Sequence, residues 1–320
     1  MEALYGDAIC PQIAGLYLPS QDRFVAVEAW REFLPMILAH EYQHALQDQH
    51  FDLERIDLLL RENEDRALAF HAVVEGEAQF VSERCMPLLV ERGVVPRVPG
   101  AGDLYRMATA AWAGAGVPGF FQEFALVAYG GCASLAGRVH ARDGWEGLDR
   151  LLREPPASTE QILHPEKLES GEPPVEVALP EGLAEAFGEA WTALHGNVLG
   201  ELMLRSVLRG MGADAVRALR ASSGWGGDRY LVLESEDGRL AWVGCFVWDT
   251  EGDAAEWLDA VERAGMPREE PEGTPSAEGP ALCSGGAGRR TWIVSGAPDG
   301  APADSMRVLL DRWASGDTPG

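Results

Sequence analysis

The five residues from His40 to His44, HEYQH, place two imidazoles and a carboxylate close together. On a helix, residues four apart project from the same face about one turn apart, so His40 and His44 can bind one metal ion. Such a set suits zinc, which in catalytic sites has three protein ligands and a water of pKa about 7. Glu41, beside the histidines, can take a proton from that water as it attacks a carbonyl. The pattern therefore predicts amide hydrolysis with Zn²⁺ as cofactor and Glu41 as general base.

A third ligand is expected on a second helix, in the segment VEGEAQF, which contains Glu75 and Glu77. These two residues point about 200° apart on a helix, so only one of them can face the histidines. Glu77 lies on the most apolar face, where a carboxylate is costly unless it is paired with a polar group or bound to metal. Glu75 lies on a face of small residues, which permits the close approach of another helix. Taken alone, the residues leave both glutamates open as the ligand.

The residues around these motifs resemble the gluzincin zinc peptidases, whose third ligand is the first glutamate of an ExxA or EGxA pattern after HExxH. In this chain that pattern is EGEA at residues 75–78. HEYQHALQDQHFDL, VEGEA, STEQILHPEK and GWGGDR together also resemble a family of prokaryotic proteins with a gluzincin-like core, over residues 14 to about 260. The resemblance implies Glu75 as third ligand. If Glu75 has that role, we expect Glu77, on the apolar face, to be a buried acid paired with an arginine or a backbone amide. Several gluzincins orient a ligand histidine with an aspartate where this chain has Gln79, whose amide oxygen can accept the same hydrogen bond.

Peptide hydrolysis also needs a donor for the developing oxyanion, which is expected outside the zinc helices. Our candidates are Tyr129, which precedes two glycines where a backbone can approach a cleft, and His164, which ends a short helix. Asp48, one turn beyond His44, could orient that ligand by accepting its second ring proton. Three other histidines are weaker candidates for these roles: His50 and His71, expected at surface or packing positions, and His195, expected within a helix.

The composition limits the partners of the chain. Its 320 residues include 26 basic and 51 acidic residues, for a net charge of -25, so nucleic acid and anionic membrane surfaces are expected to be repelled. An acidic surface also keeps a protein soluble. The five cysteines contain no CxxC pair, which argues against a cysteine zinc site or a dense disulfide framework. We see no signal peptide and no membrane segment, and we leave the location unassigned.

The site residues need elements that position them. Residues 13–27 contain two β-prone runs around the turn-forming PSQD and predict a hairpin before the HEYQH helix. Apolar spacing predicts a second long helix over residues 63–89, and helical patterns return over residues 183–221. The hairpin offers a strand edge along which an extended peptide or protein substrate could dock.

After residue 221 the pattern changes to strands. We therefore predict an α+β protein in which residues 1–221 form a mostly helical, metallopeptidase-like zinc domain and residues 222–320 form a smaller α+β accessory domain. The elements expected in the second domain are strands at 229–234, 240–248 and 291–295, helices from about 251 and 303, and a Pro- and Glu-rich linker at 267–280.

The function expected from these observations is that of a zinc-dependent peptidase. One rival is a zinc-containing binding protein or pseudo-peptidase that does not hydrolyse its partner. Another is a protein without metal, in which HEYQH is only part of a solvated helix.

Overall fold

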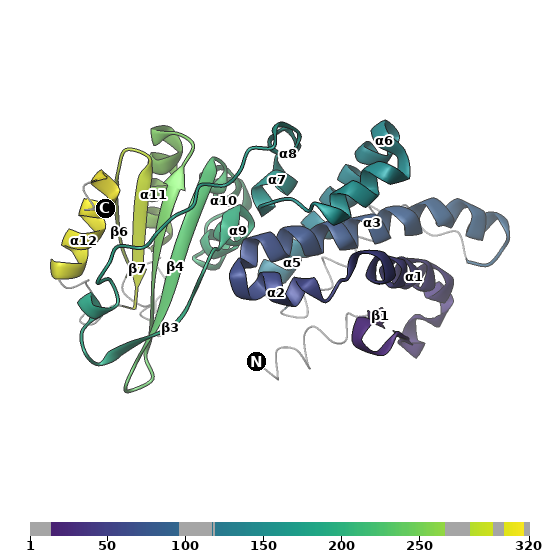
Figure 1. Cartoon of the computed structure of the whole chain (residues 1–320), viewed down its shortest axis with the longest axis horizontal. Helices are drawn as coiled ribbons and strands as arrows, with labels where there is room; N and C mark the ends of the chain where they lie inside the picture. The colour runs from purple at the N-terminus through teal and green to yellow at the C-terminus, as the bar shows by residue number, and fades with distance from the viewer. Residues whose placement is uncertain (1–13, 96–116, 118, 266–281, 297–303, 317–320) are drawn as a thin grey trace, which may run out of the picture. The chain divides into compact units, whose positions relative to one another are not determined.

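The computed structural model describes residues 14–95, 117, 119–265, 282–296 and 304–316 (Figure 1). The protein is an α+β protein, as predicted. Its chain divides into two compact units, residues 1–62 with 66–172 and residues 63–65 with 173–320.

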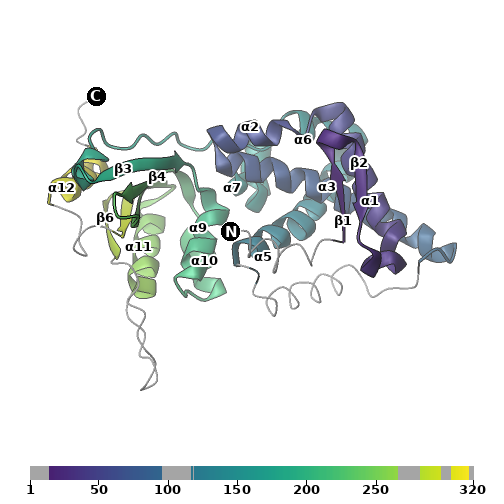
Figure 2. The ribbon, with the colours of Figure 1, turned by 90° about the horizontal axis from the view of Figure 1, so that it is seen from below.

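The described part of the first unit starts with an antiparallel hairpin, as predicted. Strand β1 (Gly15–Leu18) pairs with β2 (Arg23–Ala26) across the short helix η3 (Pro19–Gln21). Asp22 closes the turn with a φ of 46°, a left-handed conformation that aspartate tolerates better than most residues. The helix η4 (Glu28–Phe33) then leads into α1, which lies alongside the hairpin (Figure 2).

The other elements described in this unit are helices. Pro35 lies in the first turn of α1, where its missing amide proton is not needed, and Asp52 ends the helix with a φ of 55°. The helices are α1 (Leu34–Phe51), α2 (Arg55–Glu62), α3 (Glu64–Glu91), α5 (Gly119–Ala125), the π-helix η5 (Leu126–Cys132), α6 (Ala133–Arg153), α7 (Thr159–Leu163) and α8 (Pro165–Ser170).

The second unit is built on a five-stranded antiparallel sheet with the strand order β3-β4-β5-β7-β6. Its strands are β3 (Trp191–Asn197), β4 (Trp225–Ser235), β5 (Leu240–Trp248), β6 (Leu282–Ala287) and β7 (Arg290–Ser295). Its helices are η6 (Glu185–Phe187), α9 (Gly200–Gly210), α10 (Ala215–Ser222), α11 (Glu251–Gly265) and α12 (Asp304–Ser315).

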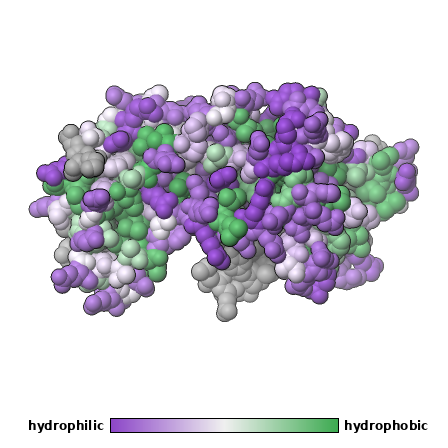
Figure 3. Space-filling view, in the orientation of Figure 1, coloured by the Kyte–Doolittle hydropathy of each residue, from purple (hydrophilic) through white to green (hydrophobic). Residues whose placement is uncertain are grey.

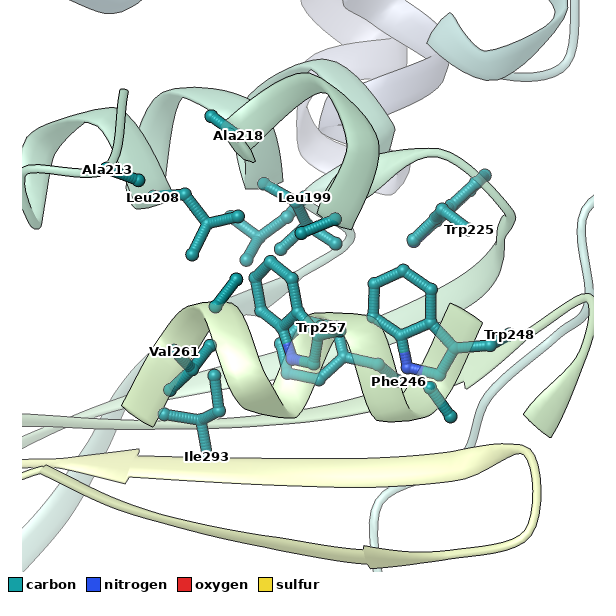
Figure 4. Packing of buried hydrophobic residues seen from close by; sticks show 14 of the residues in the cluster. Leu199, Leu208, Ala213, Ala218, Trp225, Phe246, Trp248, Trp257, Val261 and Ile293 are labelled. Carbon is teal, nitrogen blue, oxygen red and sulfur yellow. The ribbon is translucent and has the colours of Figure 1, made fainter. Parts of the chain in front are cut away.

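Both faces of this sheet are covered, because successive strand residues point to opposite sides. On one face Trp257 of α11 packs against Phe246 and Trp248 of β5, together with apolar residues of α9 and α10 (Figure 4). On the other face α12 packs against residues that include Trp292 of β7. The sheet thus lies between α9, α10 and α11 on one side and α12 on the other (Figure 1).

Residues 191–197 differ from the prediction. His195 was expected within a helix, but it lies in β3, which pairs with β4 and forms one edge of the sheet. Because β3 joins this sheet, the domain boundary expected between residues 221 and 222 falls inside the second compact unit, which resumes at Pro173. The linker expected at residues 267–280 lies outside the described residues.

Strand β6 was not anticipated, while the other described strands and helices after residue 222 lie where the sequence predicts them. Its residues, LCSGGA, include two glycines, which have low β-propensity, and the strand is defined by pairing with β7.

The face of the molecule in Figure 3 is largely hydrophilic with scattered apolar residues. Among the described helices, none has the length and apolar character needed to span a bilayer.

Candidate metal centre

Helix α1 turns both candidate ligand histidines and Glu41 toward the interior of the first unit. The buried positions of this helix follow helical spacing: Ile37, Glu41, His44, Ala45 and Gln47. The rings of His40 and His44 lie edge to face with centroids 4.7 Å apart, and their Nε2 atoms are separated by 3.1 Å. Both ring nitrogens therefore face one point, as the four-residue spacing predicts.

Glu75 of α3 completes the group. Its Oε2 lies 3.3 Å from Nε2 of His40 and 3.6 Å from Nε2 of His44, and the ligand atoms of all three residues lie within 4.8 Å of one another. Ligands about 2.1 Å from a tetrahedral zinc ion are separated from each other by roughly 3.4 Å. The separations in this group match that value, so the donor set and its spacing fit a zinc ion.

Glu77, the other candidate ligand, points elsewhere. Its Oε2 accepts a hydrogen bond of 2.7 Å from the side-chain amide of Gln47, and burial raises the pKa of its carboxyl group. Glu77 is a buried acid, as expected if Glu75 faces the histidines. The expectation of an arginine or backbone partner was wrong, because the side chains of Gln47 and Gln43 are the hydrogen-bond partners of this carboxyl group.

Gln47 also orients a ligand. Its Oε1 lies 2.8 Å from Nδ1 of His44 and accepts a hydrogen bond from the N–H at that nitrogen, which leaves Nε2 directed at Glu75. The sequence suggested Asp48 or Gln79 for this kind of role. Instead, Asp48 accepts hydrogen bonds from the hydroxyl of Tyr17 and the amide of Leu53, and Gln79 donates to Glu83.

Gly76 explains how a third helix reaches the site. A Cβ atom at this position would lie 2.3 Å from Cβ of Cys132 and 2.6 Å from its carbonyl carbon, so only glycine allows the π-helix η5 to pack this closely on α3. The packing brings Tyr129 of η5 to the site, with its ring centroid 5.9 Å from that of His40.

Tyr129 remains a hydrogen-bond donor in this environment. Burial is the largest cause that raises its pKa well above the usual range, followed by the charge of Glu75 and a hydrogen bond to it. The phenol is therefore protonated at neutral pH. Of the two residues considered as oxyanion donors, Tyr129 is the one that these interactions connect to Glu75.

His164 lies between α7 and α8, with its Nδ1 3.8 Å from the carboxylate of Glu166. Helix α7, which it ends, packs against η5, the helix of Tyr129. These contacts do not join it to the group of His40, His44 and Glu75, and its role in catalysis stays a prediction.

Glu41 is held by the hairpin. Its Oε2 accepts a hydrogen bond of 2.7 Å from the backbone amide of Tyr17 in β1. Gly15 lies against the same side chain, since a Cβ there would lie 3.4 Å from Cγ and Oε1 of Glu41 and 2.3 Å from Ile37. Burial is the largest cause that raises the pKa of Glu41, opposed by the two histidines and the Tyr17 amide. The hairpin thus fixes this carboxylate next to the candidate ligands.

The ligand residues influence each other's protonation. Burial opposes the charged form of Glu75, but the charge of His44 and hydrogen bonds from three histidines outweigh it and hold the pKa well below the usual range. Burial likewise lowers the pKa of His44, yet the charge of Glu75 and its hydrogen bond raise it to about 9. Glu75 is therefore a carboxylate at neutral pH, the form in which it can bind a cation.

One neighbour of the site was missed by the sequence analysis. His71, expected at a surface or packing position, lies one turn before Glu75 on α3 with its Nε2 3.3 Å from Oε1 of Glu75. The four-residue spacing between the two residues was a signal for this contact.

Comparison with known proteins leaves the metal centre unassigned. A family model described as "Domain of unknown function (DUF8575)" matches residues 189–307, a region inside the second unit that does not include His40, His44 or Glu75. The match starts just before β3, which agrees with the place of that strand in the sheet. No curated protein and no solved structure matches the chain.

Proposed function

We propose that this chain is a zinc-dependent peptidase with a gluzincin-like site, in which His40, His44 and Glu75 bind the metal and Glu41 is the general base. One observation carries the proposal. Two helices bring three ligand atoms within 4.8 Å of one another, and the carboxylate of Glu41 lies on the same buried face of α1. Two imidazoles, one carboxylate and a neighbouring carboxylate are the parts that zinc-assisted amide hydrolysis requires.

The chain's own residues have distinct tasks in this proposal. Bound zinc supplies a Lewis acid and a water whose pKa is lowered to about 7. Glu41 accepts a proton, and its raised pKa brings the carboxyl group closer to the range in which it can also return that proton to a leaving amine. The Tyr17 amide keeps Oε2 of Glu41 in one place during these steps.

Tyr129 is the proposed donor to the oxyanion of the substrate. Its phenol stays protonated, and its hydrogen bond to Glu75 places it beside the ligands. A donor that is already oriented toward the developing charge stabilises the transition state more than one that must reorient.

The proposed substrate is an extended peptide or an unfolded protein segment. Within the part of the chain that the structure describes, β1 and β2 form a sheet of two, so each has one edge without a strand neighbour there. The amide of Val27 donates to the carbonyl of Ala14, so these two residues form a hydrogen-bonded pair. Hydrogen-bonded and non-hydrogen-bonded pairs alternate along antiparallel strands, which makes Tyr17 and Phe24 a non-hydrogen-bonded pair. The Tyr17 amide therefore points away from β2 and donates to Glu41. A peptide that docks along this edge of β1 would lie close to the general base.

A zinc-containing binding protein without hydrolytic activity is the second candidate. It is favoured by the same hydrogen bond between Tyr17 and Glu41, because one oxygen of the general base is already occupied by a backbone amide. In that case the metal would stabilise α1 and α3, and the hairpin would serve to bind a partner.

Glu41→Gln separates the two candidates. Glutamine keeps the size of the side chain but cannot accept the proton, so we expect normal zinc content and a loss of casein or peptide-library hydrolysis of at least about 100-fold. Glu54→Gln, at an exposed position after α1, is the control and should hydrolyse like wild type. Equal hydrolysis by wild type and Glu41→Gln would contradict the role of Glu41, and a zinc-loaded wild type that cleaves no member of the library would favour the binding protein.

A further inference from the structure

The two oxygens of the Glu75 carboxylate have different neighbours. Oε2 faces Nε2 of His40 and of His44, at 3.3 and 3.6 Å, while Oε1 lies 3.3 Å from Nε2 of His71. An ionised carboxylate only accepts hydrogen bonds, so His71 must donate to Oε1. His71 and Glu75 are four residues apart on α3, and this spacing keeps the two side chains on one face of the helix.

Packing restricts the His71 ring as well. Its centroid lies 5.1 Å from that of Phe124 on α5, and 42% of the side chain is exposed. The ring therefore has one side against an aromatic neighbour and its Nε2 against the carboxylate. The pair is only partly exposed, because just 14% of the Glu75 side chain is accessible, so the contact lies beside the ligand atoms and not on the open helix surface.

We propose that His71 is a positioning residue of the zinc site, which holds Oε1 of Glu75 so that the glutamate offers the metal only Oε2. This inference rests on the proposed function. A carboxylate that bound through both oxygens would take one more position around the metal, and that position is the one a water molecule needs. Hydrogen bonds from neighbours of this kind fix the orientation of a ligand and raise metal affinity.

The test uses three variants of the full chain. His71→Leu removes the donor but keeps an apolar side chain against Phe124. His71→Gln restores a donor, because the glutamine amide nitrogen lies about as far along the side chain as Nε2 of histidine. His50→Leu is the control, since His50 is an exposed histidine on α1 whose ring neighbour is Phe51. Far-ultraviolet circular dichroism of each variant checks that the helices are intact.

Two measurements are made on each variant. Zinc affinity is determined by competition with a chelator, and we expect a Kd about 10- to 100-fold weaker for His71→Leu, with His71→Gln and His50→Leu close to wild type. Visible absorption of the Co²⁺-substituted proteins reports coordination number, and we expect the weaker band of a higher coordination number for His71→Leu only. A structural role alone would not change this spectrum.

The outcomes separate this inference from the function on which it rests. If His71→Leu binds zinc as tightly as wild type and gives the same Co²⁺ spectrum, His71 is not a positioning residue, and the zinc peptidase proposal is unaffected. If His71→Gln is as impaired as His71→Leu, the hydrogen bond is not the cause and the inference is also wrong. If wild type binds neither metal, both the inference and the proposed function fail.

Discussion

The side-chain oxygen of Gln47 lies 2.8 Å from Nδ1 of His44. This contact selects the tautomer of His44 that leaves Nε2 available on the side of Glu75. The amide nitrogen of the same side chain donates to Glu77 and to the carbonyl of Val74, at 2.7 and 3.0 Å. One buried side chain on α1 thus orients a candidate ligand and satisfies a buried acid on α3.

Replacing Gln47 should weaken both the metal site and the fold. In Gln47→Leu the His44 ring loses its acceptor, so we expect zinc affinity to fall about 10- to 100-fold. Glu77 loses its donor while it stays buried, which should cost about 1–3 kcal/mol in the free energy of unfolding. Gln49→Leu, at an exposed position two residues later, is the matched control. Chelator competition and urea unfolding measure the two effects, and equal values for Gln47→Leu and the control would contradict the assigned role.

Close packing of η5 on α3 depends on Gly76. The added methyl group of Gly76→Ala would lie 2.3 Å from Cβ of Cys132, so we expect a loss of at least about 1–3 kcal/mol in the free energy of unfolding. Gly137→Ala on α6 is the control, because its methyl group would lie 3.6 Å from the Phe80 ring, an ordinary contact.

Gly137→Ala should instead leave stability unchanged or raise it by up to about 1 kcal/mol, since alanine is the better helix former. Thermal unfolding of the two variants gives the comparison. If Gly76→Ala is as stable as Gly137→Ala, the tight contact between α3 and η5 is not a feature of the folded protein.

Asp228 makes the stability of the second unit depend on pH. Its carboxylate accepts hydrogen bonds from the amides of Leu199 and Gly200 and from the indole of Trp225, but burial dominates and raises its pKa from 3.8 to about 6. Between these two values the unfolded chain has lost this proton and the folded chain still holds it. The contribution of Asp228 to the free energy of unfolding is therefore fully present below about pH 4 and is lost as the pH rises through about 6.

The difference between the pKa of Asp228 in the unfolded chain and in the folded protein corresponds to about 3 kcal/mol in the free energy of unfolding. We expect the free energy of unfolding of wild type, relative to Asp228→Asn, to fall by that order between pH 4 and pH 7. The variant is the reference because asparagine does not ionise and other titrating groups act equally in both proteins. A difference between the two proteins that stays constant over this range would show that Asp228 ionises in the folded protein as it does in the unfolded chain.

Local spacing was enough to predict the main features of the candidate site. The interval between His40 and His44 sets the direction of both rings on one helix, and the turn residues between β1 and β2 define the hairpin within a short stretch. The choice of Glu75 over Glu77 depended on the resemblance to the gluzincins and on small residues such as Ala72 and Ala78 on its side of the helix. These features are properties of single helices and turns.

Features that depend on partners far apart in the chain were not predictable in the same way. Strand β3 contains alanine and leucine at exposed positions, a composition typical of a helix. It becomes a strand because it pairs with residues of β4 that lie 33 to 44 positions later in the chain. Gln47 was overlooked because its role depends on Glu77, a residue of another helix. His71 was expected at a surface or packing position, although its four-residue distance from Glu75 was visible in the sequence.

Zinc binding by Glu75→Ala and Glu77→Ala tests the central claim most directly, because these two residues of α3 were the alternatives for the third ligand. Titration of the metal-free proteins with zinc should give about one site per wild-type chain. We expect Glu75→Ala to lose most of this affinity, and Glu77→Ala, whose carboxylate is bonded to Gln47, to retain binding within about tenfold of wild type. Tight zinc binding by Glu75→Ala together with loss of binding by Glu77→Ala would contradict the account, as would a wild-type chain that binds no zinc.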